Sequence, residues 1–281
     1  MINFELRFST EQGAQIRREV NMKITALVEN TTNKDWRAEH GLSLFIETEH
    51  HKLLFDTGQS GLFAENAQKA GIDLSQVDIC VLSHGHYDHG GGLKIFSQIN
   101  DKAKIYMNRY AFGFHYHGSE RYNGLERSWL EDDELQQRIV YTDGTVNLDE
   151  ELTLCAPGRD KRVDMGSAGL CLLENGKFYP DDFRDEHYLL ISENGKRVLF
   201  SGCSHQGIIN IMEWFRPDVL IGGFHFMKQK PDAVLAEYGG MLDRYDTDYY
   251  TCHCTGTEQF YFLKTRMRRL YYLSEGEAII V

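Results

Sequence analysis

Three histidines and one aspartate lie within a six-residue stretch of the chain, at His84, His86, Asp88 and His89. Neutral imidazole is the commonest metal ligand in proteins and accepts Zn, Fe, Mn or Ni, and a carboxylate adds the negative charge that favours a second ion. The cluster follows an apolar run at 79–82, which predicts a buried strand leading directly into it. A polar loop with incidental histidines is disfavoured by this spacing, so we predict a transition-metal site here.

One loop with four ligands cannot complete two metal sites, so further ligands must come from other parts of the chain. Three later segments each place one histidine just beyond an apolar, strand-like run, at His205, His225 and His253. A single histidine at any one of these positions is equally consistent with a structural role. The repetition of one pattern at three positions favours a role in the site for each of them.

The rest of the chain alternates apolar, β-branched runs with segments of helical spacing. Alternating or continuous apolar runs predict strands at 20–29, 42–48, 53–55, 79–82, 104–107, 152–155, 169–173, 188–192, 198–201, 219–221, 247–252 and 278–281. Apolar residues at helical spacing predict helices at 63–70, 93–99, 207–215, 232–245 and 257–267. Strands in runs with interleaved helices indicate an α/β sandwich with the sheets inside and the helices outside, and no linker divides it into domains.

Two segments lack this regularity. Residues 109–147 are rich in aromatic and charged side chains and begin without a clear strand or helix period. Long irregular segments inside a domain are commonly functional, and we predict a lid-like insertion whose aromatic side chains cover the pocket, with an ordinary surface insertion as the alternative. The residues before the first strand look like an appended arm.

Composition narrows the class of partner. Acidic residues outnumber basic residues, 42 against 30, which gives a formal net charge of −12. Such a surface repels phosphate backbones, so we expect no nucleic-acid partner, whereas bound metal ions would add local positive charge and remain compatible with a small anionic substrate. No stretch approaches the roughly 20 apolar residues of a membrane helix. Six cysteines in a chain of 281 residues without an export signal predict reduced thiols and a cytoplasmic protein.

The run His84-x-His86-x-Asp88-His89 resembles the signature of the metallo-β-lactamase superfamily, and Asp56-Thr57-Gly58 is similar to the turn that braces its metal loop. The resemblance extends from about residue 22 to residue 281. It implies an αββα four-layer sandwich with the site along one edge of the two sheets. It also implies that residues 1–21 are an N-terminal extension of a domain at 22–281.

Further segments resemble one subgroup, named after an archaeal synthase that joins a dihydropterin to ribosyl-aminobenzene phosphate; they lie at 27–30, 39–43, 202–210, 222–225 and 253–256. The resemblance implies that one ion is held by His84, His86 and His205. It implies that the other ion is held by Asp88, His89 and His253. Asp56 would orient a ligand imidazole through its second nitrogen.

The chain departs from the superfamily at one expected ligand. Many members have a bridging aspartate where this chain has Cys203, two residues before His205. A thiolate binds Zn and Fe well, so Cys203 is either a ligand or a buried structural cysteine. His187 lies where other branches of the superfamily place a ligand, and we expect His205 to take that role in its stead.

These expectations define a reaction class. Two metal ions would activate a water molecule for hydrolysis of a small organic phosphate or ester. Zn is the simplest choice of metal, with Mn or Fe as alternatives. Asp88 would also accept the proton of that water, and His225 would contact the substrate or protonate the leaving group. The alternative on the same metal site is a synthase that forms a carbon–nitrogen bond on a pterin. An iron redox site is disfavoured because no flavin domain accompanies it, and a non-catalytic metal protein would not need six ligands.

Overall fold

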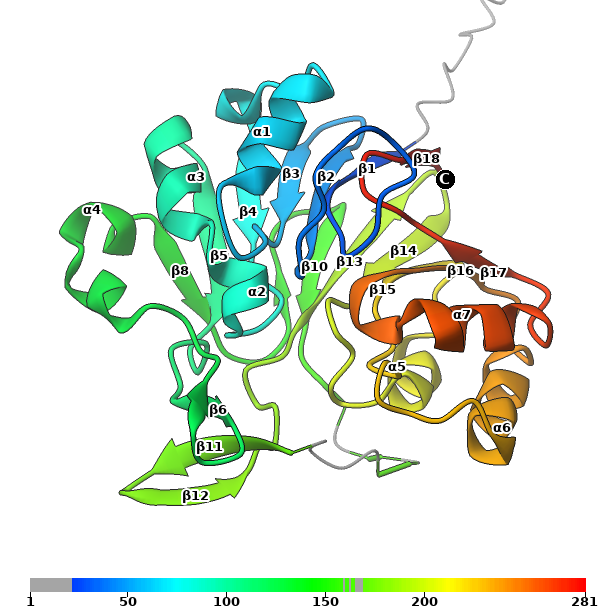
Figure 1. Ribbon diagram of the computed structural model, residues 1–281. Helices are drawn as coiled ribbons and strands as arrows, with labels where there is room; N and C mark the ends of the chain where they lie inside the picture. The colour runs from blue at the N-terminus through cyan, green and yellow to red at the C-terminus, as the bar shows by residue number, and fades with distance from the viewer. Residues whose placement is uncertain (1–21, 159, 162, 165–168) are drawn as a thin grey trace, which may run out of the picture.

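The computed structural model describes residues 22–158, 160–161, 163–164 and 169–281; the predicted extension at 1–21 lies outside them. Two seven-stranded sheets form its centre (Figure 1). The first contains, in spatial order, β18 (Ala278–Ile280), β1 (Lys23–Val28), β2 (Ser43–Glu47), β3 (Lys52–Phe55), β4 (Ile79–Val81), β5 (Lys104–Asn108) and β8 (Ile139–Thr142). The second contains β17 (Leu270–Tyr272), β16 (Asp248–Thr251), β15 (Val219–Gly222), β14 (Lys196–Phe200), β13 (Tyr188–Glu193), β10 (Leu152–Cys155) and β9 (Val146–Asn147).

Helices cover the outer face of each sheet. The first sheet is covered by α1 (Leu62–Lys69) and α3 (Leu93–Ile99). The second is covered by α5 (Ile208–Phe215), α6 (Ala233–Leu242) and α7 (Thr257–Lys264). Three buried clusters correspond to the three interfaces of this arrangement, one between the sheets and one between each sheet and its helices. The predicted αββα four-layer sandwich is therefore confirmed.

Strand β2 shows how the sequence builds two of these interfaces at once. Successive side chains of a strand point to opposite faces of the sheet. Leu44 and Ile46 accordingly pack between the sheets, whereas Phe45 packs under the helices of the first sheet. All three are at most 2% exposed, and each buried side chain of this size contributes roughly 1.5–3 kcal/mol to folding.

The parallel strands of both sheets determine where functional loops lie. In the first sheet β3, β4, β5 and β8 are parallel neighbours, and in the second β14, β15, β16 and β17 are. Parallel neighbours end at the same edge of a sheet, and ligand sites of α/β proteins form beyond their carboxyl ends. The loops that follow β3, β4, β14, β15 and β16 are therefore brought to a common edge.

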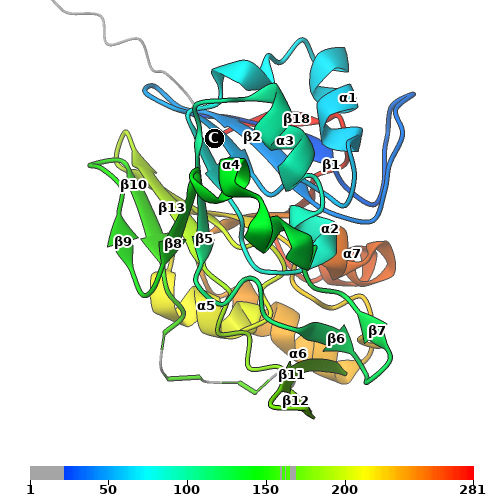
Figure 2. The ribbon, with the colours of Figure 1, turned by 90° about the vertical axis from the view of Figure 1, so that its left-hand side faces the viewer.

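A small third sheet stands outside the sandwich (Figure 2). Its order is β12 (Lys177–Pro180), β11 (Leu170–Glu174), β6 (His115–His117) and β7 (Arg121–Tyr122). The segment 109–147, which the sequence marks as lid-like, supplies β6, β7, the 3-10 helix Arg127–Glu131 and α4 (Asp133–Gln136). It also supplies β8 and β9, which belong to the two central sheets, so only the part up to residue 138 stands outside them. Its role as a lid stays a prediction.

No helix in the described part of the chain is both long and apolar enough to cross a membrane.

Candidate metal centre

The loops that carry the candidate ligands contain a concentration of unusual backbone conformations. Four non-glycine residues in them have a positive φ, namely Asp56 at 59°, Ser204 at 57°, His225 at 55° and His253 at 49°. A non-glycine residue held in the left-handed region costs of order 1–3 kcal/mol, and such residues cluster at functional sites. The backbone is thus strained at the ends of β3, β14, β15 and β16, where side chains from both sheets converge.

One group of three imidazoles comes from the loops after β4 and β14. His84 Nε2 lies 3.0 Å from His86 Nδ1 and 3.2 Å from His205 Nε2. All three side chains are buried, at 5% exposure or less. The three nitrogens lie within 4.8 Å of one another and could hold a metal ion. The structure therefore brings together the three residues that the sequence assigned to the first ion.

A second group faces the first. His89 Nε2 lies 3.2 Å from His253 Nε2, and Asp88 Oδ2 lies 3.5 Å from the same atom of His253. These are the residues that the sequence assigned to the second ion. His89 and His253 are fully buried, at 0% and 1% exposure, whereas Asp88 reaches the pocket described below.

Hydrogen bonds fix which nitrogen of each imidazole faces the centre. His89 Nδ1 donates to Asp56 Oδ2 at 2.7 Å, and His253 Nδ1 donates to Asn30 Oδ1 at 2.9 Å. The backbone N–H of Gly41 donates to the same Asn30 oxygen at 3.1 Å, which determines the orientation of that amide. Because both Nδ1 atoms carry the proton, both Nε2 atoms carry lone pairs.

Asp56 also reaches the first group through a serine. Its Oδ2 accepts a hydrogen bond from Ser83 Oγ at 2.8 Å, and its Oδ1 accepts one from the backbone N–H of Ser83 at 2.7 Å. The hydroxyl oxygen of Ser83 lies 2.8 Å from His84 Nδ1 and, as its own proton is committed to Asp56, it accepts from that nitrogen. His84 Nε2 therefore also carries a lone pair. One carboxylate thus orients ligands of both groups.

These arrangements fit bound cations. Two neutral imidazoles whose lone pairs face each other across 3.2 Å, as at His89 Nε2 and His253 Nε2, repel one another in a dry interior, and a cation between them removes that repulsion. Burial, and secondarily the neighbouring histidines, lower the pKa of the imidazoles in both groups; this holds for His84, His86, His205 and His253. Neutral imidazoles are the form that binds a metal.

Two carboxylates give the site a negative charge that would stabilise a bound cation. Burial alone would raise the pKa of Asp88, but the hydrogen bond from His40 and the nearby histidines lower it overall, so the carboxylate is ionised. Burial would lower the pKa of His89, yet the pKa is raised because Asp56 and then Asp88 favour positive charge on the ring. The same field stabilises a cation at His89 Nε2.

Comparisons with known proteins agree with this geometry. The sequence model of the metallo-β-lactamase superfamily matches residues 36–253. The chain belongs to the metallo-β-lactamase superfamily. It is 30% identical to an uncharacterized protein of Methanocaldococcus jannaschii over 240 residues, which is 83% of this chain and 90% of that protein. It is 28% identical over 262 residues to the 7,8-dihydropterin-6-methyl-4-(β-D-ribofuranosyl)-aminobenzene-5'-phosphate synthase of the same organism, covering 84% of this chain and 88% of the synthase.

A solved structure of the superfamily is also similar along most of the chain. It is described as a metal-dependent hydrolase of the β-lactamase superfamily, with a TM-score of 0.78 and 27% sequence identity. The match covers 92% of this chain and 99% of that one. Enzymes of this superfamily are typically metal-dependent, and the candidate ligand groups described above are of the type that could hold metal ions.

Cys203, where many superfamily members have an aspartate, lies in the centre. Its Sγ is 3.2 Å from His89 Nε2, and the cysteine is 3% exposed. Its sulfur lies within 4.8 Å of candidate ligand atoms of His84 and His89 on one side and of His253 on the other. Burial, and secondarily Cys254, raise the pKa of the thiol. The position of the sulfur would let it bind a cation as thiolate although its pKa is raised without one, and whether it does so stays a prediction.

His187 lies outside the two groups. Its Nε2 donates to the backbone carbonyl of Leu82 at 2.6 Å, and its Nδ1 lies 3.4 Å from Thr142 Oγ1. Its backbone N–H donates to the carbonyl of Ser83 at 3.0 Å. The residue thus braces the end of β4 just before the metal loop, as a buried imidazole whose pKa is lowered to about 4 by burial.

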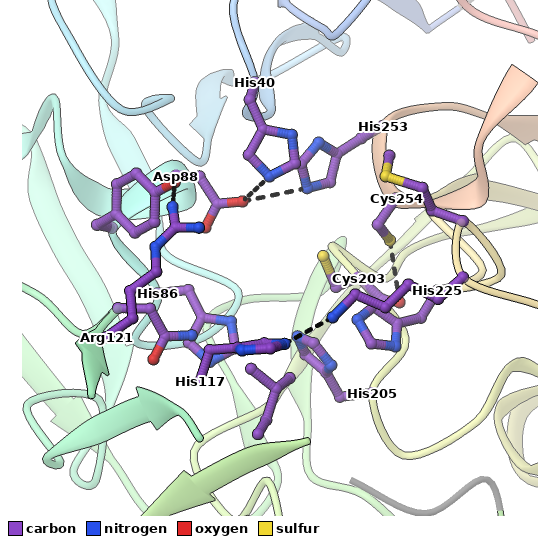
Figure 3. Close-up of a pocket in the computed structure, with 15 residues that line it drawn as sticks. His40, His86, Asp88, His117, Arg121, Cys203, His205, His225, His253 and Cys254 are labelled. Carbon is purple, nitrogen blue, oxygen red and sulfur yellow. Dashed lines mark hydrogen bonds and ion pairs between the residues drawn. The ribbon is translucent and has the colours of Figure 1, made fainter. Parts of the chain in front are cut away.

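Sequence reasoning gave no role to two residues that position ligands. His40 Nε2 lies 3.0 Å from Asp88 Oδ2, and its ring packs 4.9 Å from that of His253 (Figure 3). Glu186, which is fully buried, accepts hydrogen bonds from the backbone N–H of His205 at 2.6 Å and of Gln206 at 2.9 Å. His40 lies within a segment that resembles the subgroup, whereas the sequence around Glu186 carries no local signal for its role.

A pocket of about 240 Å³ opens over the two groups and is lined by His86, Asp88, Cys203, His205 and His253 among others (Figure 3). His225 also lines it, with its ring 4.4 Å from that of His205. Burial, and secondarily Lys228, lower the pKa of His225 to about 4.

The expectation that aromatic side chains of the insertion cover this pocket is wrong. The insertion contributes His117, Arg121 and Asn123 to the pocket lining. Two of its aromatic side chains, Tyr110 and Phe112, line a separate pocket of about 290 Å³. The hairpin of β6 and β7 turns its polar residues toward the metal loop because the backbone N–H of Tyr87 donates to the carbonyl of Asn123 at 2.9 Å.

Proposed function

We propose that the protein is a metal-dependent hydrolase that acts on a small organic phosphate or ester. The observation that carries the proposal is the pair of buried imidazole groups whose ring nitrogens converge at the floor of an open pocket. A first ion would be held by His84, His86 and His205, and a second by Asp88, His89 and His253. Zinc suits this donor set, and Mn or Fe accept the same ligands.

A pair of such ions supplies an activated water molecule and withdraws charge from a phosphoryl or carbonyl oxygen. The protein's own residues would then orient the water molecule and accept its proton. Asp88 is ionised and reaches the pocket, so we assign it the hydrogen bond that orients the attacking water and the acceptance of its proton. Its Oδ2 is held at 3.0 Å from His40 Nε2, whose hydrogen bond orients the carboxylate.

His225 has a different role. A ring whose pKa is lowered to about 4 is neutral near pH 7, so it is a poor source of a proton for a leaving group. A neutral imidazole in the pocket lining is a suitable hydrogen-bond donor to a substrate oxygen. We therefore assign His225 to substrate binding and charge stabilisation in preference to acid catalysis. The partner of this site is a small molecule, in keeping with a pocket of about 240 Å³.

A second candidate is a synthase that forms a carbon–nitrogen bond on a pterin with the same metal site. It is favoured by the 28% identity to the archaeal synthase across 84% of this chain. Stacking of a pterin on aromatic residues of the insertion gives it no support, because Tyr110 and Phe112 line a separate pocket.

Metal analysis of the purified protein, combined with a substrate panel, tests the proposal. The panel contains a phosphodiester, a phosphomonoester, a lactone and a thioester, and His86→Ala serves as the metal-deficient control. Two equivalents of metal with turnover of one class support the hydrolase. Two equivalents without hydrolysis, but with condensation of a dihydropterin diphosphate and an aminobenzene riboside phosphate, support the synthase. Less than one equivalent after reconstitution contradicts both.

A further inference from the structure

Two cationic side chains stand at the mouth of the metal pocket without an acidic partner. Arg121 and Lys228 line the pocket, and neither forms an ion pair with a carboxylate among the residues that the structure describes. Arg109, Arg184 and Arg268, by contrast, each pair with an acid.

The two cations are held in place by a tyrosine and a histidine, neither of which supplies a negative charge, so their charge is not compensated. Arg121 donates one hydrogen bond to the hydroxyl of Tyr87 at 2.9 Å, and its guanidinium lies 5.8 Å from the centre of that ring. Lys228 Nζ donates to His117 Nε2 at 2.7 Å. An arginine has five N–H donors and a lysine three, so most of their donors are available to a ligand.

A further pocket residue has an unsatisfied polar atom. Asn123 is 8% exposed, and its buried Oδ1 accepts no hydrogen bond from the described residues. A buried polar oxygen without a partner costs about 1–3 kcal/mol in general. A hydroxyl or amino group of a ligand bound beside Arg121 would remove that cost.

These groups are fixed relative to the metal loops by the backbone. Tyr87 N–H donates to the carbonyl of Asn123 at 2.9 Å, and His86 pairs with Gly124 as an isolated bridge. On the other side, the N–H of Met227 donates to the carbonyl of Cys254 at 3.0 Å. Both arms of the pocket mouth are therefore attached to the loops that carry the ligands.

We propose that Arg121, Lys228 and His117 form a phosphate-binding subsite at the pocket mouth. It holds a phosphate monoester group of the substrate that is separate from the bond to be cleaved, which lies over the metal centre. A phosphate dianion compensates both fixed positive charges, whereas a carboxylate compensates only one. This inference rests on the proposed function, because it assigns the substrate class of the same pocket.

Calorimetric titration of the metal-loaded protein tests the subsite with three small probes. Glycerol 3-phosphate should bind, glycerate should bind more weakly, and glycerol should show no binding. Arg121→Met and Lys228→Met should each weaken the binding of glycerol 3-phosphate on the order of tenfold, the effect of losing one hydrogen bond to a charged group. Lys230→Met is the matched control, because Lys230 is exposed on the same segment but does not line the pocket.

Metal content is measured for each variant in the same samples. The subsite is overturned if Arg121→Met/Lys228→Met binds glycerol 3-phosphate as tightly as the parent protein with its metals in place, since the phosphate then sits on the ions. It is also overturned if glycerate binds as tightly as glycerol 3-phosphate, or if the parent protein binds neither. All three results leave the proposed hydrolase intact, whereas failure of the parent protein to take up metal refutes that function directly.

Discussion

Substitution of Asp56 by asparagine isolates the role of the one carboxylate that orients both ligand groups. Asn has the same shape, so its oxygen can still accept from the backbone N–H of Ser83, which lies 2.7 Å from Asp56 Oδ1. Its NH2 group would replace the oxygen that lies 2.7 Å from His89 Nδ1. Two donors would then face each other, and the imidazole of His89 must turn or move its proton to Nε2. In either case His89 loses the lone pair directed at the centre.

The size of the effect follows from the contacts. Loss of the outer hydrogen-bond partner of a metal ligand typically weakens metal binding by 10- to 100-fold, which corresponds to about 1.4–2.7 kcal/mol. The first group should be spared, because Ser83 Oγ can accept from the new amide and still accept from His84 Nδ1, which lies 2.8 Å away. Asp56→Asn should therefore retain one tightly bound ion and release the other at low chelator concentration.

Competitive titration with a chromogenic chelator, followed by elemental analysis, measures both affinities. Asp78→Asn is the matched control, because Asp78 Oδ2 makes the same kind of contact with His51 Nδ1, at 2.8 Å, on the surface. Its metal binding should equal that of the parent protein. If Asp56→Asn binds two ions with unchanged affinity, the assignment of His89 as a ligand oriented by Asp56 is wrong.

Three further substitutions address single residues. His225→Asn should lower kcat by about 10²- to 10³-fold with unchanged metal content, and a lowered metal content would instead place His225 among the ligands. Cys203→Ala should abolish a thiolate-to-metal charge-transfer band of the cobalt-loaded protein, which Cys254→Ala should retain; a band that persists in Cys203→Ala excludes Cys203 as a ligand. His187 has a pKa of about 4 in the folded protein against the ordinary histidine value of 6.5, so its contribution to stability is complete above pH 6.5 and is lost as the pH falls from 6.5 to 4. The free energy of unfolding of the metal-free parent protein and of metal-free His187→Gln is measured in urea at both ends of that range. The amount by which the parent protein exceeds the variant should decrease by about 3 kcal/mol from pH 6.5 to pH 4. A constant difference would contradict the buried neutral imidazole.

The sandwich could be predicted because its strands are buried on both faces or alternate clearly. Ser43–Glu47 is such a case, with one side chain toward the helices and two between the sheets. The missed elements had weaker patterns. Strand β17, Leu270–Tyr272, has three residues and is only partly buried, so tertiary pairing with β16 defines it. Strand β12 could have been found, since Asn175-Gly176 is a hairpin turn of the same type as Asn194-Gly195.

The candidate ligands could be predicted for a similar reason. Each follows a parallel strand, and parallel strands of one sheet end at a common edge, so His205 and His253 had to lie near one another. His84 follows a strand of the other sheet, and the packing of the two sheets brings it to His205. The metal loop contains one helical turn, Tyr87–Gly90, which the sequence analysis did not predict. That turn places Asp88 toward the pocket and His89 toward Asp56.

The lining of the pocket mouth could not be predicted, because it depends on pairing between distant segments. Strand β6 pairs with β11, so His115–His117 is positioned by residues that lie more than 50 positions later in the chain. Nothing in the local sequence distinguishes His117, which lines the pocket, from His115, whose Nδ1 is bound to Asp181 Oδ2 at 2.9 Å. The aromatic side chains around them misled the interpretation, since Tyr116 packs against Tyr122 and Phe178 of the small sheet.

The metal-ligand groups and the proposed substrate contacts belong to different parts of the fold. The ligand groups are fixed by the sandwich, through strand ends that are buried and through Asp56, Glu186 and Asn30. The proposed substrate contacts come from a hairpin that touches the metal loop through its backbone, at Tyr87 N–H and Asn123 O. Side chains at Arg121 and His117 can therefore be replaced without disturbing that backbone contact. We expect substitutions in the hairpin to change which substrate binds, and substitutions at Asp56 to change whether metal binds, with little overlap between the two effects.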